Sequence, residues 1–210
     1  MSASVSAILL AAGESQRMNG RNKLLLSVGG APLFRRSLET LLNSELGEIV
    51  VVLGYQQELL RPFISGGRIK ICYNENYKDG HMSSIYTGWQ ALREPCDGVM
   101  ICLADQPFLT SMDVNTLIAA FAGRGRHSIV VPSYQGQRGN PVVFAYQYRA
   151  SVLQNNRNRG CRYLIDENPD QVIPLQMETD HVITDVDTLA AYEAVQRRFM
   201  VDSTLSAQVQ

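Results

Sequence analysis

Short, uninterrupted apolar runs alternate with segments of helical periodicity along most of this chain. The apolar runs, each continuous enough for a parallel strand covered on both faces, are residues 5–10, 49–53, 98–103 and 129–132. Segments with apolar side chains at helical spacing lie between or after them, at residues 33–42, 84–92 and 114–121. This alternation predicts a three-layer α/β fold with a mostly parallel sheet. Ligands bind outside the carboxyl ends of the strands in such sheets, so we expect the site there.

The composition fits an ordinary globular chain of 210 residues with 45% hydrophobic residues and a net charge of −1. We expect one domain over residues 1–200 and a flexible tail over residues 201–210. The charge balance lacks the positive excess of a general nucleic-acid or membrane-surface binder, and no stretch approaches the ~20 apolar residues of a membrane span. No basic leader precedes the first apolar run, so we expect a cytoplasmic protein with neither nucleic-acid nor membrane partners.

The cysteines and histidines do not suggest a zinc site or a disulfide framework. The four cysteines contain no C-x-x-C pair, and two of them lie in apolar strand-like runs, where a thiol acts as a small hydrophobe. The three histidines are scattered and lack the spacing of zinc ligands. We therefore expect reduced, structural cysteines.

The loop after the first apolar run combines small residues with cations. Ala11, Ala12 and Gly13 let backbone N–H groups approach an anion, and Arg17 and Lys23 follow. The pattern is neither a Walker loop nor G-x-G-x-x-G. It predicts a phosphate-binding loop, and the alternative is a surface turn with solvated charges.

Residues 103–107 (L-A-D-Q-P) come directly after the strand expected at residues 99–102. An acidic residue at a strand end, held in shape by a proline, suits a hard divalent cation that bridges nucleotide phosphates. The alternative is that Asp105 caps the helix that begins near Ser111, but Thr110, Ser111 and Asp113 are nearer candidates for the cap. We therefore favour a site role for Asp105.

A partner carboxylate is available in residues 184–188 (T-D-V-D-T). Their alternation is typical of a short strand, which would place Asp185 and Asp187 on one face. The alternative is that Asp187 or Thr188 is the N-cap of the helix expected at residues 189–198.

Two further polar elements could line a substrate cleft. Residues 80–88 (G-H-M-S-S-I-Y-T-G) begin a helix with hydroxyls and free N–H groups, although Ser83 could simply be its N-cap. Residues 136–141 (G-Q-R-G-N-P) form a polar turn before an apolar strand at 142–145.

These elements together resemble one family. A-A-G-x-S-x-R-M followed by Gly and Lys looks like the signature loop of the MobA-like nucleotidyltransferases, and L-A-A-G resembles their molybdenum cofactor cytidylyltransferase branch. L-A-D-Q-P matches fully, and G-x-x-S-S, D-V-D-T and G-C-R-Y-L (160–164) also resemble family elements. The chain departs from the family in three places: one extra residue between Arg17 and Lys23, Asn140 for histidine, and Leu189 for proline.

The resemblance implies a Rossmann-like, GT-A-like nucleotidyltransferase fold and a magnesium-dependent transfer of CMP from CTP to molybdopterin with release of pyrophosphate. It implies catalytic roles for Arg17, Lys23 and Asp105. The implied nucleotide-binding residues are Leu10, Ala11, Ala12, Gly13, Lys23, Gly80, Ser83, Ser84 and Asp105. The implied acceptor-binding residues are Gln106, Arg138, Gly139, Asn140, Pro141 and Arg162. Asp105 and Asp187 are the implied metal ligands, with Asp185 in reserve.

Several alternatives stay open within this interpretation. GTP could replace CTP, and a sugar or polyol phosphate could replace molybdopterin. The chain could also be a non-catalytic molybdenum cofactor carrier or maturation chaperone. A transient partner would be a molybdenum hydroxylase or its maturation chaperone.

Overall fold

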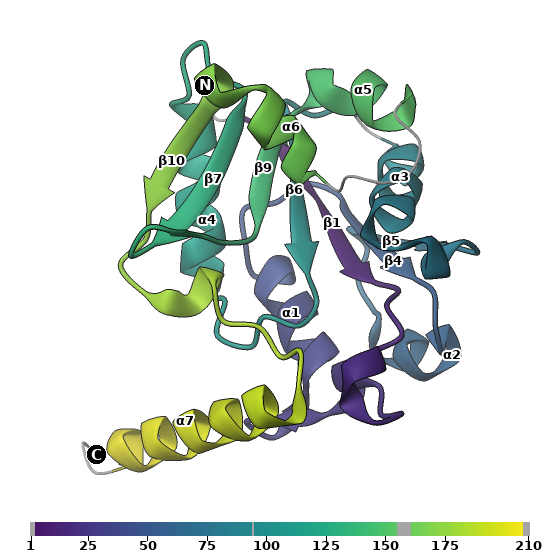
Figure 1. Cartoon of the computed structure of the whole chain (residues 1–210), viewed down its shortest axis with the longest axis vertical. Helices are drawn as coiled ribbons and strands as arrows, with labels where there is room; N and C mark the ends of the chain where they lie inside the picture. Colours follow the sequence, from purple (N-terminus) through teal and green to yellow (C-terminus); the bar gives the residue numbers. More distant parts are fainter. Residues whose placement is uncertain (1–2, 94, 155–160, 208–210) are drawn as a thin grey trace.

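The computed structural model describes residues 3–93, 95–154 and 161–207. Its centre is an 8-stranded sheet in the order β10-β7-β9-β6-β1-β4-β5, with β8 paired to β7 (Figure 1). The strands of this sheet are β1 (Val5–Ala11), β4 (Ile49–Leu53), β5 (Ile69–Tyr73), β6 (Gly98–Leu103), β7 (Ile129–Tyr134), β8 (Gln137–Arg138), β9 (Val142–Ala145) and β10 (Val172–Gln176). A separate hairpin consists of β2 (Ser27–Val28) and β3 (Ala31–Pro32).

Most neighbouring strands are parallel. β1 pairs in parallel with both β4 and β6, β4 with β5, and β7 with β10. β9 lies antiparallel between β6 and β7. β1, β4 and β6 are the apolar runs of the sequence, and their residues are almost entirely buried because helices cover both faces.

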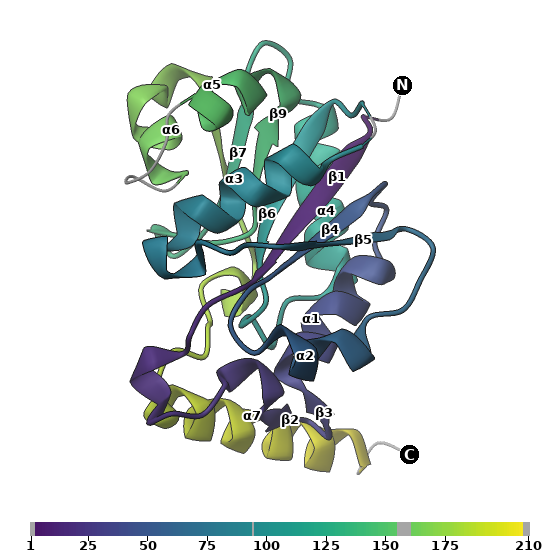
Figure 2. The same ribbon diagram turned by 90° about the vertical axis from the view of Figure 1, so that its right-hand side faces the viewer.

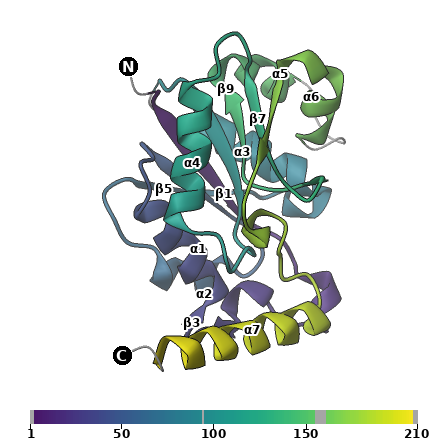
Figure 3. The same ribbon diagram turned by 90° about the vertical axis from the view of Figure 1, so that its left-hand side faces the viewer.

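Helices cover the two faces of the sheet (Figures 2 and 3). One face carries α3 (His81–Ala91), α5 (Arg149–Gln154) and α6 (Arg162–Glu167), and the other carries α1 (Leu33–Leu42) and α4 (Ser111–Ala122). α2 (Gln57–Leu60) follows β4, and α7 (Leu189–Ala207) closes the described chain. Short 3-10 turns are η1 (Gln16–Met18), η2 (Lys23–Leu25), η3 (Arg61–Phe63), η4 (Tyr77–Asp79), η5 (Tyr146–Tyr148), η6 (Pro169–Gln171) and η7 (Asp180–Val182). The predicted three-layer α/β fold is confirmed.

α3 lies unusually close to the sheet. A Cβ atom on Gly88 would come within 2.4 Å of the Ile8 side chain on β1, so only glycine fits at this crossing. Trp89 beside it is fully buried. This close packing fixes the start of α3 near the end of β1.

α7 packs across the end of the molecule toward which β1 and β6 point (Figure 1). A second apolar cluster beneath it contains Met18 of η1, Val28, Leu33, Val186 and Val195. The helix is longer than the expected 189–198 and continues to Ala207. The domain boundary expected at residue 200 therefore lies within a helix.

Neither Asp105 nor Asp187 caps a helix, because other residues make the caps of α4 and α7. Thr110 caps α4 in a reciprocal capping box with Asp113, which leaves Asp105 free of that role. The Thr188 hydroxyl accepts a hydrogen bond from the Ala191 N–H at 3.1 Å, so Thr188 rather than Asp187 caps α7. Asp105 and Asp187 are thus available for other contacts.

The helices and the cysteines bear on two expectations from the sequence. None of the helices among the described residues is long and apolar enough to cross a membrane. All four cysteines are free thiols, and burial raises the pKa of Cys72 to about 11.

Candidate active site

A cavity of about 400 Å³ opens at the carboxyl ends of β1 and β6. Its lining contains ten of the residues predicted for the site: Leu10, Ala11, Ala12, Gly13, Arg17, Lys23, Gly80, Ser84, Asp105 and Asp187. The lining also contains residues that the sequence did not single out: Glu14, Ser15, Gln16, Leu24, Tyr77, Lys78, His81, Leu103 and Ala104.

The loop between β1 and α1 folds so that Arg17 and Lys23 line this cavity. Ser15 adopts a left-handed conformation, and its hydroxyl accepts a hydrogen bond from the Lys23 N–H at 3.1 Å. Asn19 (φ 51°) and Gly20 (φ 79°) make a left-handed turn between them. Lys23 follows this turn and lines the cavity.

Two cations and two carboxylates form a compact cluster in the cavity. The Lys23 ammonium donates to Asp105 Oδ2 and, at 2.7 Å, to Asp187 Oδ1. The Arg17 guanidinium donates to Asp187 Oδ2 at 2.6 Å. Side chains of Lys23 and Asp105 are only 16% and 14% exposed, so this pairing is poorly screened by solvent.

The contacts of the cluster favour the charged forms of Lys23 and Asp187. Burial alone would lower the pKa of Lys23, but Asp105 and Asp187 outweigh it, and the pKa lies above its ordinary value. Burial likewise works against the charge of Asp187, and contacts with Lys23 and Arg17 hold its pKa below the ordinary value. Lys23 and Asp187 therefore form an ion pair in the resting cluster.

The segment that carries Asp187 is held against the L-A-D-Q-P loop by the backbone. The Val186 N–H donates to the Asp105 carbonyl at 3.0 Å, and the Val186 side chain is fully buried. The strand expected at residues 184–188 is wrong: the segment has no strand partner and is irregular. This backbone contact holds the residue before Asp187 against the L-A-D-Q-P loop.

Asp185, the reserve ligand, is exposed and lies outside the lining of the cavity. Its pKa is raised, first by partial burial and then by the negative charges of Asp105 and Asp187. It therefore adds negative potential near the cluster without joining it.

The carboxylates fit a divalent cation. Asp105 Oδ1 is buried and has no hydrogen-bond partner in the described part of the chain, as expected of an oxygen kept for another ligand. Carboxylate oxygens are preferred ligands of magnesium and manganese. No group of three or more His, Cys, Asp or Glu that could hold a metal occurs among the described residues. A metal at Asp105 and Asp187 would thus need further oxygens from a substrate or water.

The opposite wall of the cavity comes from η4 and the start of α3. Gly80 (φ 89°) turns the chain into α3, and Tyr77, Lys78 and His81 flank it. Sequence reasoning identified only the Gly80 and serine positions of this wall. Tyr77, Lys78 and His81 lie within three residues of Gly80 in the chain, and this proximity was the available signal.

The two serines of α3 face different surroundings. Ser84 lines the cavity, whereas Ser83 lines a separate space of about 390 Å³ with Asn74 and Asn76. The Ser83 hydroxyl donates to the carbonyls of Asn76 and Gly80, and Gly80 rather than Ser83 is the N-cap. Ser83 therefore lies outside the cavity in which nucleotide binding was expected.

The residues expected to bind the acceptor do not line the cavity. Arg138 is exposed and pairs with Asp166 at 2.7 Å, and Arg162 is exposed at the start of α6. Gly139 and Pro141 are buried, and the Asn140–Pro141 peptide is cis. Gly160, the first residue of the expected G-x-R-x-L turn, lies outside the described residues.

Gln106, the remaining predicted acceptor residue, is only 3% exposed and binds backbone carbonyls of Asn140 and Val182 instead of facing the cavity. The turn at residues 138–141 thus folds beneath the L-A-D-Q-P loop and against η7.

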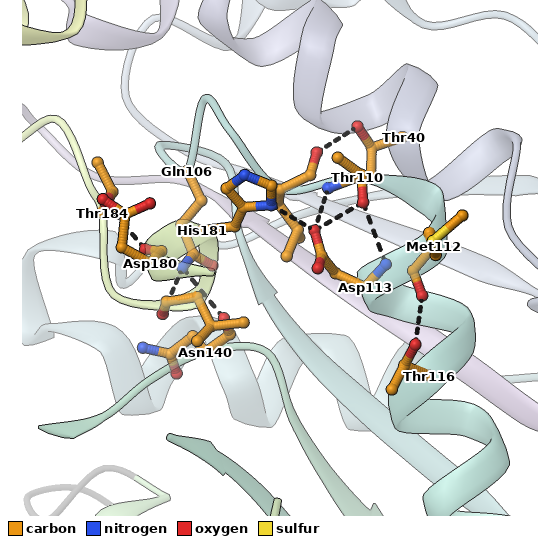
Figure 4. A network of polar contacts seen from close by, with 12 residues as sticks. Thr40, Gln106, Thr110, Met112, Asp113, Thr116, Asn140, Asp180, His181 and Thr184 are labelled. Atoms are coloured by element: carbon orange, nitrogen blue, oxygen red, sulfur yellow. Dashed lines mark hydrogen bonds and ion pairs between the residues drawn. The ribbon is translucent and has the colours of Figure 1, made fainter. Parts of the chain in front are cut away.

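A polar network extends from this region to the start of α4 (Figure 4). Asp113 accepts hydrogen bonds from the Thr110 N–H and hydroxyl, and its Oδ2 lies 2.9 Å from His181 Nδ1. Burial alone would raise the pKa of Asp113, but His181 and Thr110 outweigh it and hold the pKa below its ordinary value. The carboxylate therefore ties η7 to α4.

Asp113→Asn is expected to destabilise the protein by about 1–3 kcal/mol at pH 7. A depressed folded-state pKa stabilises the fold above the ordinary carboxyl pKa, and this contribution disappears as the pH falls through the folded-state value. Urea unfolding should therefore show a difference in the free energy of unfolding between Asp113→Asn and the wild type that is smaller at pH 3 than at pH 7. Asp166→Asn, at an exposed ion pair, is the control and should change stability little at either pH. An equal difference in the free energy of unfolding at both pH values would contradict the role of the carboxylate charge.

The chain matches the model of the MobA-like NTP transferase domain over residues 7–172. The purine catabolism protein PucB of Bacillus subtilis (strain 168) is 29% identical over 201 residues, which cover 90% of this chain and 95% of that protein. The nicotine blue oxidoreductase of Paenarthrobacter nicotinovorans is 26% identical over 88% of this chain and 93% of that protein. A probable molybdenum cofactor guanylyltransferase of Methanosarcina acetivorans is 28% identical over 71% of this chain and 66% of that protein.

Solved structures agree in fold. Rv0371c from Mycobacterium tuberculosis H37Rv superimposes with a TM-score of 0.81 at 19% identity, covering 94% of this chain and 100% of that chain. The complex of that protein with manganese superimposes with a TM-score of 0.75 at 18% identity, covering 92% and 98%. The Rossmann-like nucleotidyltransferase fold expected from the sequence is confirmed.

Proposed function

Because the chain belongs to the MobA-like NTP transferase family, we propose that it transfers CMP from CTP to molybdopterin in a magnesium-dependent reaction that releases pyrophosphate. In this reaction a terminal phosphate of the pterin attacks the α-phosphorus of CTP, a new P–O bond forms, and the bond to pyrophosphate breaks. No protein nucleophile takes part.

One observation carries the proposal: two cations and two carboxylates, distant in sequence, meet in a cavity at the carboxyl ends of β1 and β6. Phosphoryl transfer needs positioning and neutralisation of charge more than covalent help from the protein. Arg17 and Lys23 supply positive charge for the triphosphate. Asp105 and Asp187 are the groups that would hold magnesium.

Substrate binding in this proposal exchanges one set of ion pairs for another. In the resting cluster Lys23 and Arg17 occupy both oxygens of Asp187 and one oxygen of Asp105. Anionic oxygens of a triphosphate compete for the ammonium and the guanidinium, and the released carboxylates become available as ligands. Magnesium, when bound there, neutralises charge on the phosphate oxygens. The related M. tuberculosis structure with manganese supports a divalent cation in this fold.

The acceptor is the part of the proposal that most needs a direct test. The relatives carry the names of a purine catabolism protein, a nicotine blue oxidoreductase and a probable molybdenum cofactor guanylyltransferase. The ion cluster would serve a sugar or polyol phosphate equally well. The experiment is therefore pyrophosphate release from each nucleoside triphosphate with magnesium, in the presence of molybdopterin, a sugar phosphate or a polyol phosphate. Release only with molybdopterin supports the proposal, and release only with another phosphate replaces the acceptor. Binding of molybdopterin without turnover by any triphosphate would make the chain a carrier instead.

CTP is expected to be preferred over GTP. Ala12 lines the cavity. We expect its methyl group to narrow the space available to a purine. Its backbone is fixed by the Tyr55 N–H, which donates to the Ala12 carbonyl at 3.1 Å. A difference of one methyl group changes the discrimination between two substrates by about 1–3 kcal/mol, or roughly ten- to two-hundred-fold in the ratio of their kcat/KM values. A competition between CTP and GTP should show this preference in the wild type and a smaller one in Ala12→Gly. A wild type that prefers GTP would contradict the assignment to the cytidylyltransferase branch.

A further inference from the structure

Gln106 follows the proposed metal ligand Asp105 in the chain but does not line the cavity. Its side chain is directed toward the turn at Asn140 (Figure 4). Its side-chain amide enters the space between two loops, where Nε2 donates to the Asn140 carbonyl at 3.1 Å and to the Val182 carbonyl at 2.9 Å. One side chain thus joins the L-A-D-Q-P loop to the turn at residues 138–141 and to η7.

The Val182 carbonyl is the point at which these segments converge. It also accepts a hydrogen bond from the Asn140 N–H at 2.8 Å. A Cβ atom on Gly139 would lie only 2.4 Å from this oxygen, so glycine allows the close approach. The position of η7 is therefore set by contacts with both the turn and Gln106.

The same segment is held a second time before it reaches the cavity. The Val186 N–H donates to the Asp105 carbonyl at 3.0 Å. Residues 105 and 106 consequently hold the chain at both Val182 and Val186, and the next residue is Asp187. The placement of the second carboxylate beside the first depends on these two anchors.

The chemistry of Gln106 fits this role. Both carbonyl contacts require a donor, which identifies the amide nitrogen at this end of the side chain. The amide oxygen is buried and lacks a hydrogen-bond partner in the described part of the chain. The burial of Gln106 is therefore offset by the two hydrogen bonds that Nε2 donates, and not by any contact of the amide oxygen.

We propose that Gln106 is a positioning residue that sets Asp187 against Asp105 by anchoring η7, rather than a residue that contacts the acceptor. The consequence for turnover rests on the proposed function, but the consequence for metal binding is measured without any turnover.

The test compares Gln106→Met and Gln106→Asn with the wild type. Methionine fills a similar volume without a donor, and asparagine keeps the amide but is too short to reach both carbonyls. The control is Ser128→Ala, because Ser128 is also 3% exposed and joins separate segments through Tyr148 and Gln171, at the opposite end of β7 from the cavity. Urea unfolding first establishes that each variant is folded under the assay conditions.

The probe is Mn²⁺ alone, and its binding is followed by the electron paramagnetic resonance signal of free Mn²⁺. This probe tests the metal site without depending on the nucleotide or the acceptor. We expect the apparent affinity for Mn²⁺ to fall roughly tenfold or more in Gln106→Met, which is the size of effect found when a supporting contact at a metal site is lost. The affinity should fall less in Gln106→Asn. It should not change in Ser128→Ala. With CTP and molybdopterin, kcat should fall while the KM for molybdopterin changes little.

The inference would be overturned if folded Gln106→Met and Gln106→Asn bound Mn²⁺ with the affinity of the wild type. It would also be overturned if Ser128→Ala lost as much Mn²⁺ affinity as the Gln106 variants, or if the wild type did not bind Mn²⁺. A change confined to the KM for molybdopterin would return Gln106 to the acceptor site and also overturn it. If the wild type binds the probe but releases no pyrophosphate with any acceptor, the proposed function fails while the metal-binding comparison still decides the role of Gln106.

Discussion

Asp105→Ala is expected to yield a folded protein whose turnover is reduced by roughly 10²–10³-fold or more, the scale seen when a group that stabilises transition-state charge is removed. Asp105 lies at the end of β6, where it lines the cavity instead of packing in the core. Its buried, unpartnered Oδ1 is the oxygen best suited to a metal among the atoms of the cluster. Lys23 keeps a partner in Asp187 after the substitution, so the ion cluster should not be left with an unpaired buried cation.

The measurement is pyrophosphate release at saturating triphosphate, with urea unfolding as a check on the fold. Asp185→Ala is the matched control, because Asp185 is also an acid near the cluster but is exposed and outside the cavity. Turnover should fall severely in the first variant and modestly in the second. Near-normal pyrophosphate release from a folded Asp105→Ala protein would remove Asp105 from the proposed mechanism.

The central strands were predictable because burial on both faces leaves an unbroken apolar signature. The run 49–53 and the run 98–103 coincide with β4 and β6 residue for residue. The edge strands β5 and β10 were not predicted, since each has one unpaired side and several partly exposed residues. Lys70 in β5 and Pro174 in β10 interrupt the apolar pattern for this reason.

The site was only partly predictable, since sequence order does not reveal how loops stack. The loop after β1, whose small residues and cations predict phosphate binding, lines the cavity. The pattern at residues 184–188 suggested a strand, but its alternation arises from one buried side chain, Val186, and one backbone contact with Asp105. The polar turn at residues 136–141 and its resemblance to a family element predict a wall of the substrate cleft, whereas the Asn140 N–H donates to the Val182 carbonyl of η7. Such contacts depend on main-chain geometry that residue types do not encode.

Lys23→Met is expected to lower turnover while raising the affinity for a divalent metal in the absence of nucleotide. Loss of one charge-assisted contact to a phosphate costs about 1.5–3 kcal/mol, or roughly one to two orders of magnitude in rate or affinity. The second effect has a different origin. In the resting protein the Lys23 ammonium binds one oxygen of each carboxylate, and its pKa lies above the ordinary value, so it stays a competitor of the metal at neutral pH.

Methionine removes that competitor while preserving most of the length of the side chain. Titration of the metal-free protein with Mn²⁺ should therefore show tighter binding in Lys23→Met than in the wild type, and pyrophosphate release should be slower at any triphosphate concentration. Arg21→Met is the control, because Arg21 lies in the same loop but is exposed and outside the cavity, and neither property should change. Opposite effects on metal binding and turnover distinguish an exchanging cation from a simple phosphate ligand, for which metal affinity without nucleotide would stay constant. Unchanged Mn²⁺ affinity in Lys23→Met would mean that the ammonium does not hold the carboxylates in solution, and the exchange of ion pairs would then be wrong.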